Sequence, residues 1–132
     1  MEIQVPITIK IVVTELFLQN LFREIEQKLR DIESQLNRLD YEAMVIKKGL
    51  ALKSGDFVEG KLKAIEQEIE NLVMMKEHLL ANRKESEGFQ MDSEIVHSQI
   101  NGLVKIEPGD NWQAKTNPEI IIEDGIIKEI RG

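Results

Sequence analysis

A chain of 132 residues that is 42% hydrophobic and 31% charged has the composition of one folded domain rather than of a disordered polymer. The absence of cysteine excludes disulfide bonds and thiolate metal sites, and the formal net charge of −7 opposes attraction to nucleic-acid phosphates. Aromatic residues make up only 5% of the chain, which favours long helices with narrow apolar seams over a thick globular core.

The N-terminal segment, MEIQVPITIK, lacks the positively charged start of a signal peptide, and Lys10 and Glu15 interrupt its apolar stretch early. No segment approaches the roughly 18 to 20 uncharged residues that a membrane-spanning helix requires. We therefore expect a soluble protein of the cytoplasm.

Residues 3 to 13 alternate between apolar and mostly polar side chains, which is the pattern of a half-buried β-strand. The apolar set is Ile3, Val5, Ile7, Ile9, Ile11 and Val13. Pro6 has no N–H to donate to a neighbouring strand, so it predicts an edge position or a bulge at that point.

A heptad pattern follows this strand. Thr14 stands where a helix N-cap is expected, with Glu15 in the favourable first turn. Apolar residues then recur at alternating spacings of four and three, at Leu18, Phe22, Ile25, Leu29, Ile32, Leu36, Leu39, Ala43, Ile46 and Leu50. This spacing predicts a coiled-coil seam on a helix that runs from about residue 15 to 53.

A short break separates this helix from a second one. Gly55 and the lysines before it are typical of a helix C-terminus, and Asp56 with Glu59 resembles a capping box at the next helix start. A turn this short predicts that the second helix folds back antiparallel, to end at about residue 84 to 86. Its predicted seam consists of Val58, Leu62, Ile65, Ile69, Leu72 and Leu79, with Lys76 out of pattern.

Period-two alternation returns after a polar connector at residues 85–92. The residues expected on one face of the next strand are Val96, Ile100, Val104 and Ile106. Gly102 is interpreted as a bulge or a point of close approach. The following residues, Pro108-Gly109-Asp110, have the chemistry of a turn.

The C-terminal segment EIIIEDGIIKEI predicts a β-hairpin around Asp124-Gly125. A two-residue loop would pair Ile122 with Ile127, whereas a three-residue loop would pair Ile122 with Ile126. We favour the three-residue loop because it gathers more isoleucines on one face.

These patterns together predict an α+β fold in the order β-α-α-β-β-β. We expect a long antiparallel helical (coiled-coil) hairpin with a small four-stranded antiparallel sheet or open barrel at its base. The expected parts are an N-terminal strand at residues 1–13, the hairpin at residues 14–86 with its turn at residues 54–56, and a C-terminal β module at residues 87–132.

The sequence contains no arrangement of residues typical of catalysis or of metal or cofactor binding. His78 stands near the end of the second predicted helix and His97 on a predicted strand, and a metal site would require convergent carboxylates as well. We interpret both as surface or interface residues. No Gly-rich elbow surrounds a serine, and no phosphate-binding loop motif occurs. We therefore expect no enzyme activity, no metal and no cofactor.

The tip of the hairpin is a candidate contact for a partner. Residues 47 to 63 hold five basic residues against two acidic ones, a local charge of +3. The candidate contact residues are Lys47, Lys48, Lys53, Phe57 and Lys61. The helix dipole alone also favours lysines near a helix C-terminus, so both interpretations stay open.

Three further groups bear on oligomerisation. The expected bounds make the first helix about ten residues longer than the second, so Leu16, Phe17 and Leu21 need cover from the β module or from another subunit. Trp112 is either a lid over the small core, the interpretation we favour, or an anchor in an oligomer interface. The adjacent pair Met74-Met75 marks either an adaptable apolar binding surface or, the interpretation we favour, one side chain in the seam and one at its edge.

The amino-acid sequences of the two chain ends resemble those of the YlqD family of bacterial proteins. IQVPITIKIVVTE near the start and GLVKIEPGDNW with EIIIEDGIIKEIR near the end carry the resemblance, whereas the helical middle would match many coiled coils. The family has no assigned activity. The resemblance therefore implies a bacterial cytoplasmic protein with this order of elements, and it transfers no catalytic residue.

Our functional hypothesis is a non-enzymatic oligomeric scaffold or protein-interaction protein, a homodimer or homotetramer, because an isolated two-helix hairpin buries each helix on one side only. One alternative is a prefoldin-like holdase chaperone that grips unfolded chains with Leu50, Leu52, Phe57 and Val58 at the tip. Another is an RNA- or ribosome-associated factor that uses the basic tip. We expect no membrane binding, and the acidic net charge disfavours nucleic acid.

Overall fold

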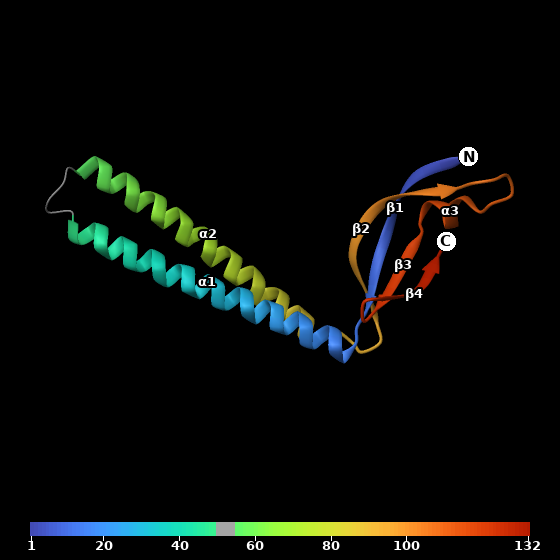
Figure 1. The fold of residues 1–132 in the computed structure, drawn as a ribbon, viewed down its shortest axis with the longest axis horizontal. Coiled ribbons are helices and arrows are strands. Elements are labelled where there is room, and N and C mark those ends of the chain that lie inside the picture. Colours follow the sequence, from blue (N-terminus) through green and yellow to red (C-terminus); the bar gives the residue numbers. More distant parts are fainter. Residues whose placement is uncertain (50–54) are drawn as a thin grey trace. The chain divides into compact units, whose positions relative to one another are not determined.

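The computed structural model describes residues 1–49 and 55–132 and has an α+β fold (Figure 1). Its elements are β1 (Glu2–Val12), α1 (Glu15–Gly49), α2 (Gly55–Glu87), β2 (Glu94–Lys105), α3 (Trp112–Thr116), β3 (Glu119–Glu123) and β4 (Ile126–Arg131). The chain divides into a sheet unit, residues Met1–Asn20 with Gly88–Gly132, and a helical unit, Leu21–Glu87. Each unit is described by itself below.

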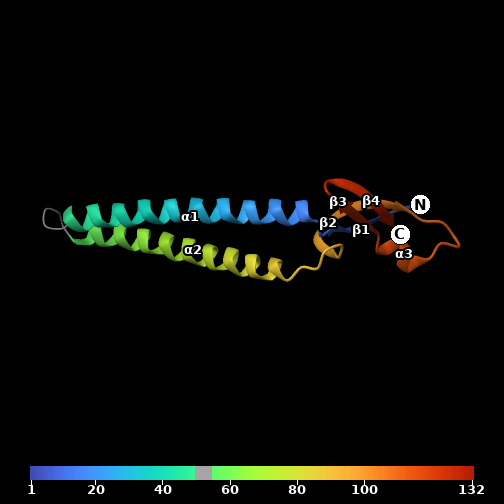
Figure 2. The same cartoon turned by 90° about the horizontal axis from the view of Figure 1, so that it is seen from below.

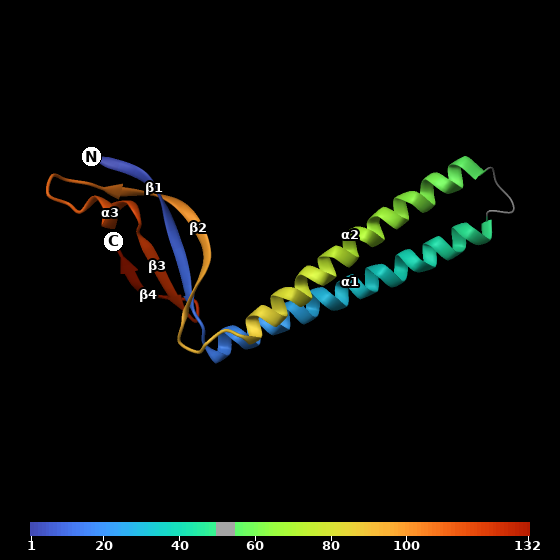
Figure 3. The ribbon, with the colours of Figure 1, turned by 180° about the vertical axis from the view of Figure 1, so that it is seen from behind.

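The sheet unit contains one four-stranded sheet in the order β2-β1-β3-β4 (Figure 3). β1 pairs antiparallel with β2 and parallel with β3, and β3 pairs antiparallel with β4. The expected four-stranded sheet is thus present, but the expectation that it is wholly antiparallel is wrong. The reason is the segment after β2, which carries the chain to the other side of β1 so that β3 runs in the same direction as β1.

That crossover contains α3, a short helix that the sequence analysis did not predict. Asn111 caps it, because its side-chain oxygen accepts a hydrogen bond from the backbone N–H of Ala114 at 3.1 Å. With only five residues, α3 is too short to produce a periodic pattern.

Pro6 occupies a position in β1 where no donor is needed. The N–H of Thr8 donates to the carbonyl of Pro118 on the β3 side, at 3.1 Å. Alternate residues of a strand direct their N–H groups to the same side, so the nitrogen of Pro6 also faces that side. β3 pairs with β1 only from Thr8 onward. The prediction of an unpaired edge at Pro6 is therefore confirmed.

The β3–β4 hairpin has a two-residue loop, so the favoured three-residue loop is wrong. Ile122 pairs with Ile127, and Asp124 and Gly125 both have positive φ, at 51° and 81°. A loop with two positive φ values matches the right-handed twist of the strands, which explains this outcome. A register shift that leaves Lys128 unpaired then returns Ile130 to a position opposite Ile120.

A bulge also interrupts β2, at His97 rather than at Gly102. Ile9 pairs with Ser98 and Lys10 pairs with Val96, so His97 has no partner on β1. The prediction that Val96 and Ile100 share a face is wrong, because the extra residue reverses the alternation between them. Gly102 is instead a point of close approach, where an added Cβ would collide with the Ile7 side chain.

The helix α1 begins as predicted. The hydroxyl of Thr14 accepts a hydrogen bond from the N–H of Phe17 at 3.0 Å, which is the N-cap contact. α1 has 35 residues and α2 has 33, so the expected ten-residue difference in length is wrong. α2 already includes Gly55, so the turn does not extend over residues 55–56 as expected. Predictions about Leu50, Leu52, Lys53 and Ser54 lie outside the described residues.

In the helical unit, α1 and α2 lie side by side (Figures 1 and 2). The buried aliphatic residues recur every seven positions, at Ile25, Ile32 and Leu39 of α1 and at Val58 and Ile65 of α2. Two ion pairs join the helices, Glu26 to Arg83 at 3.6 Å and Glu33 to Lys76 at 2.7 Å. The second pair lies seven residues later on α1 than the first but seven residues earlier on α2. The two helices are therefore antiparallel.

Neither α1, α2 nor α3, over their described residues, combines the length and apolar character required to cross a membrane.

Candidate assembly surface

The pairing register assigns the strand residues of the sheet unit to two faces. Residues directly opposite each other on paired strands share a face, and alternate residues of one strand do the same. One face, here called the aliphatic face, gathers residues from all four strands. Its members are Ile3, Val5, Ile7, Ile9, Ile11, Ile95, Ile100, Val104, Ile120, Ile122, Ile127 and Ile130.

The aliphatic face is only partly buried. Val5 on the central strand β1 is 5% exposed, but Ile100 on β2 is 47% exposed, and Ile127 and Ile130 on β4 are 58% and 70% exposed. A sheet face of aliphatic side chains normally packs against another layer. Its outer strands therefore leave apolar surface exposed to solvent.

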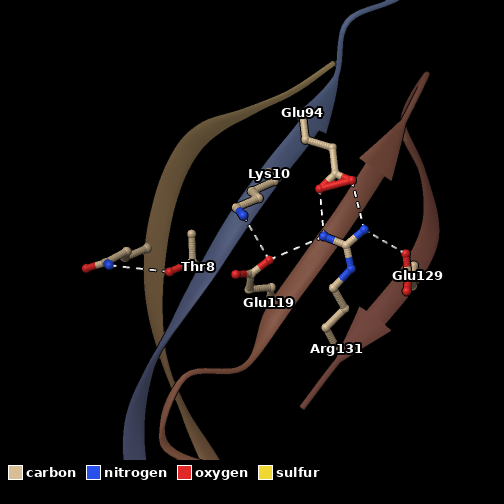
Figure 4. A network of polar contacts seen from close by, with 7 residues as sticks. Thr8, Lys10, Glu94, Glu119, Glu129 and Arg131 are labelled. Carbon is tan, nitrogen blue, oxygen red and sulfur yellow. Dashed lines mark hydrogen bonds and ion pairs between the residues drawn. The ribbon is translucent and has the colours of Figure 1, made fainter. Parts of the chain in front are cut away.

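The opposite face carries an ion-pair network centred on Arg131 of β4 (Figure 4). Its guanidinium donates to Glu94 of β2 at 2.6 and 2.8 Å, to Glu129 at 3.0 Å and to Glu119 of β3 at 3.5 Å. Lys10 of β1 also pairs with Glu119, at 3.0 Å. The network thus joins all four strands.

The contact between Glu94 and Arg131 shows that the sheet curls toward this second face. The two residues lie on opposite edge strands, β2 and β4, with β1 and β3 between them. In a flat sheet these strands would be about 14 Å apart, too far for a direct bidentate contact between the two side chains. On the same face, Val12 and Ile121 are buried. Part of the buried core of the sheet unit therefore lies on the ionic side, whereas Val5 is buried on the aliphatic face.

The network also shifts two pKa values. Hydrogen bonds from Arg131 lower the pKa of the Glu94 carboxyl below its ordinary value, while partial desolvation acts in the opposite direction. The hydrogen bonds to Glu94 and Glu129 raise the pKa of Arg131. These groups stay ionised at neutral pH, which is typical of a structural ion pair.

The predicted oligomer-interface residues are only partly available. Leu16 is exposed, whereas Phe17 and Leu21 are half-buried. Trp112 is 64% exposed, so the favoured interpretation of this residue as a lid over the core is wrong. It lines an open pocket of about 340 Å³ together with Met1, Ile106, Glu107, Pro108, Asp110 and Lys115.

The described tip residues lie on the surface, with one exception. Lys47, Lys48, Phe57 and Lys61 are exposed, and the Lys61 ammonium lies 4.6 Å from the centre of the Phe57 ring. Val58, which the holdase hypothesis uses as an apolar contact, is buried instead. It lies seven residues before Ile65, at the same seam position. Lys53 is outside the described residues.

A groove of about 710 Å³ runs along the helical unit beside the seam. Met74 and Met75 both line it and are both exposed, so the expectation that one of them lies in the seam is wrong. The remaining lining residues are Lys28, Asp31, Ile32, Gln35, His78 and Leu79.

The two histidines are on the surface, His78 at this groove and His97 at the β2 bulge. Across residues 1–49 and 55–132, no three His, Asp or Glu side chains converge as metal ligands would.

Neither the aliphatic face nor the ion-pair network was predicted from the sequence. The alternation of residues predicted an apolar side for each strand, but it does not say which strands become neighbours. The charged residues of the network are spread from Lys10 to Arg131 and have no spacing signal. One signal was available for the aliphatic face, namely that each of the predicted strands carried aliphatic residues on one side.

Comparison with known proteins identifies one family. The family model described as YlqD protein matches residues 1–131. A crystal structure of a protein of unknown function from Synechococcus sp. WH 8102 is similar to this chain, with a TM-score of 0.76 and 26% sequence identity over 100% of this chain and 96% of that one. No curated protein matches.

Proposed function

The chain belongs to the YlqD family, and we propose that it is a non-enzymatic scaffold that self-associates through the aliphatic face of its sheet unit. The observation that carries the proposal is the exposure of Ile100, Ile127 and Ile130 on a face that is otherwise mostly aliphatic. A second copy of the same face offers complementary chemistry, since both surfaces are apolar and of the same size.

The size of the aliphatic face supports a second copy as its partner. The strands have 11, 12, 5 and 6 residues. At about 3.3 Å per residue and 4.8 Å per strand, they cover about 540 Å². Two such faces packed together would bury about 1,100 Å², close to the roughly 1,000 Å² that a specific interface requires.

In this proposal the helical unit serves as an arm. The seven-residue recurrence of its buried residues supports a two-stranded coiled coil, whose exposed tip side chains Lys47, Lys48, Phe57 and Lys61 would contact a partner. A cytoplasmic location belongs to the same proposal and is supported by the cysteine-free composition.

Multi-angle light scattering on two matched variants tests the proposal. Ile130 and Ile126 lie on the same strand and are 70% and 72% exposed, but Ile130 is on the aliphatic face and Ile126 is on the opposite one. We expect Ile130→Lys to dissociate the oligomer because it places a charge in the apolar interface, and we expect Ile126→Lys to leave the mass unchanged. Equal masses for both variants and the wild type would rule out this face as the interface.

A further inference from the structure

The outer edge of β2 is a long, uncharged strand edge. β2 is at one end of the sheet order, and no strand in the described part of the chain pairs with its outer side. No charged residue occurs from Ile95 to Val104. Exposed edges of this kind pair readily with other strands unless charges, prolines or bulges protect them.

The other edge of the sheet, β4, is protected in this way. It carries Lys128, Glu129 and Arg131 within six residues, and Lys128 forms a bulge. The bulge of β2 at His97 lies near one end and leaves Ser98–Lys105 in regular pairing with β1. The contrast between the two edges marks β2 as the edge open to a partner strand.

The hydrogen-bonding groups that face outward on β2 can be identified. The N–H of Ile106 donates to the carbonyl of Met1 at 2.8 Å. In an antiparallel ladder, the even-numbered residues from Ser98 to Ile106 therefore direct their backbone N–H and C=O groups toward β1. The odd-numbered residues Gln99, Asn101 and Leu103 therefore direct their N–H and C=O groups outward, where the described chain offers no strand.

We propose that β2 pairs antiparallel with β2 of a second copy, with Ile100 opposite Ile100 at the two-fold axis. This inference rests on the proposed self-association but uses a different surface. The paired residues across the two copies would be Gln99 with Asn101, Ser98 with Gly102, Val96 with Leu103, Ile95 with Val104 and Glu94 with Lys105.

This register brings together residues of matching chemistry along the whole strand. Val96 and Leu103, both more than 60% exposed in one copy, cover each other, and two amide side chains meet at Gln99 and Asn101. At the ends, Glu94 meets Lys105, which adds a cation beside a carboxylate that already binds Arg131. The outward N–H and C=O groups of Gln99 and Asn101 satisfy each other, as an antiparallel ladder requires.

The alternation of faces is consistent with the same register. Ile100, Ile95 and Val104 lie on the aliphatic face, so pairing them with each other keeps that face on one side of the combined sheet. The result is an eight-stranded sheet with a continuous aliphatic face twice the size of that of one copy. Edge pairing and face packing together would produce a tetramer of two-fold symmetry.

Disulfide trapping tests the register directly, because the chain contains no cysteine. Ile100 of the two copies would form a pair without hydrogen bonds between them, with Cα atoms about 4.5 Å apart, within the range of a disulfide. Under oxidised glutathione, we expect Ile100→Cys to form a covalent dimer about tenfold faster than Leu103→Cys, because only residue 100 meets its own copy. Since Leu103 is the more exposed residue, random collision would give the opposite order.

A second variant separates edge pairing from face packing. Gln99→Pro removes an outward backbone N–H without removing a backbone hydrogen bond to β1, and on β1 it loses only the side-chain contact of Gln99 Nε2 with Thr8 Oγ1 at 3.4 Å. It should therefore abolish the Ile100→Cys cross-link while the circular dichroism of the chain stays unchanged. Packed sheets are about 10 Å apart, beyond the reach of a disulfide, so the face interface does not account for the cross-link.

The outcomes keep the two proposals distinguishable. If Ile130→Lys leaves the mass of the protein unchanged while Ile100→Cys still cross-links in a Gln99→Pro-sensitive manner, the face proposal fails and the edge inference stands. If Leu103→Cys cross-links as fast as Ile100→Cys, or if Gln99→Pro has no effect on the cross-link, the edge inference is overturned.

Discussion

The helical unit and the sheet unit bury their aliphatic residues in different ways. In the helical unit, Ile25, Ile32 and Leu39 of α1 are buried in a seam that the chain's own α2 completes. In the sheet unit, Ile100, Ile127 and Ile130 are exposed on a face that gathers residues of all four strands. The heptad positions of α1 are thus buried within the chain, whereas strand alternation produced a face that stays partly exposed, the surface for which we propose a second copy as partner.

The two units also differ in where their charged residues lie. The helical seam changes from aliphatic to polar along α2, where Lys76 and Arg83 follow Leu62 and Ile69 at seven-residue intervals and pair with glutamates of α1. The sheet unit instead places its ion pairs on one face and most of its isoleucines on the other, with Ile121 and Ile126 as the exceptions. Charge thus lies within the interface of one unit and is kept away from the proposed interface of the other.

The largest expected effect is a cavity in the helical seam. Leu39→Ala should lower the free energy of unfolding of the hairpin by about 3 kcal/mol, because Leu39 is 2% exposed and its removal leaves a void. Urea denaturation followed by circular dichroism measures this loss. Tyr41→Ala, two residues away and exposed, should change stability by less than about 0.5 kcal/mol. Equal losses would show that the seam is not closed within the chain.

The next effect concerns the β3–β4 loop. Gly125→Ala should destabilise the sheet unit by about 1 kcal/mol, because Gly125 has a φ of 81°, which an L-residue adopts only with strain. Gly60→Ala in α2 is the matched control, since neither glycine has a neighbour within 4 Å of an added Cβ. It should stabilise the helical unit by roughly 0.5 to 1 kcal/mol. Melting temperatures that shift in the same direction for both variants would contradict the positive φ of Gly125 or the helical conformation of Gly60.

A smaller effect is expected where the helical seam is polar. Lys76 is half-buried at a seam position, so Lys76→Leu should raise the free energy of unfolding by about 1 kcal/mol through apolar burial. The lost ion pair costs little, since the Glu33 side chain is 52% exposed and stays hydrated. Lys84→Leu, which also changes a lysine of α2 but an exposed one, is the control and should show no such gain. A loss of stability in Lys76→Leu would mean that the ion pair, not the apolar seam, holds this end together.

The smallest effect is a pH dependence of the sheet unit. Because the pKa of Glu94 is lower in the folded chain than in the unfolded one, its contribution to stability is fully present above the unfolded pKa of about 4.3. The contribution is lost as the pH falls through the folded pKa. In Glu94→Gln, we expect a melting temperature that depends less on pH below about 5 than that of the wild type. Carboxyl chemical shifts would check the direction, and an unshifted Glu94 would contradict it.

Periodicity in the sequence predicted the elements well and their pairing less well. The alternation of residues 3–13 and the heptads from Leu18 onward correspond to β1 and α1, because each pattern reflects local geometry. The parallel pairing of β1 with β3 had no such signal, since it depends on the path of the chain through α3. The bulges at His97 and Lys128 reversed faces that simple alternation had assigned, and no turn residue marks either one.

For the aliphatic face, the sequence predicted individual apolar residues but not their combination into one surface. The isoleucines of residues 120–130 were recognised as apolar, but their combination with Ile7 and Ile100 into one face depends on strand order. The interface residues chosen from the sequence, Leu16 and Trp112, are exposed but lie outside that face. A single sequence shows which side chains prefer burial, and the fold decides which of them stay uncovered.

Sedimentation equilibrium of the wild-type chain tests the central claim, that the sheet unit binds a second copy. The account predicts a mass of two or four times 15.2 kDa at micromolar concentration, with a lower mass for Ile130→Lys. A wild-type chain that stays at 15.2 kDa across the concentration range would contradict the account.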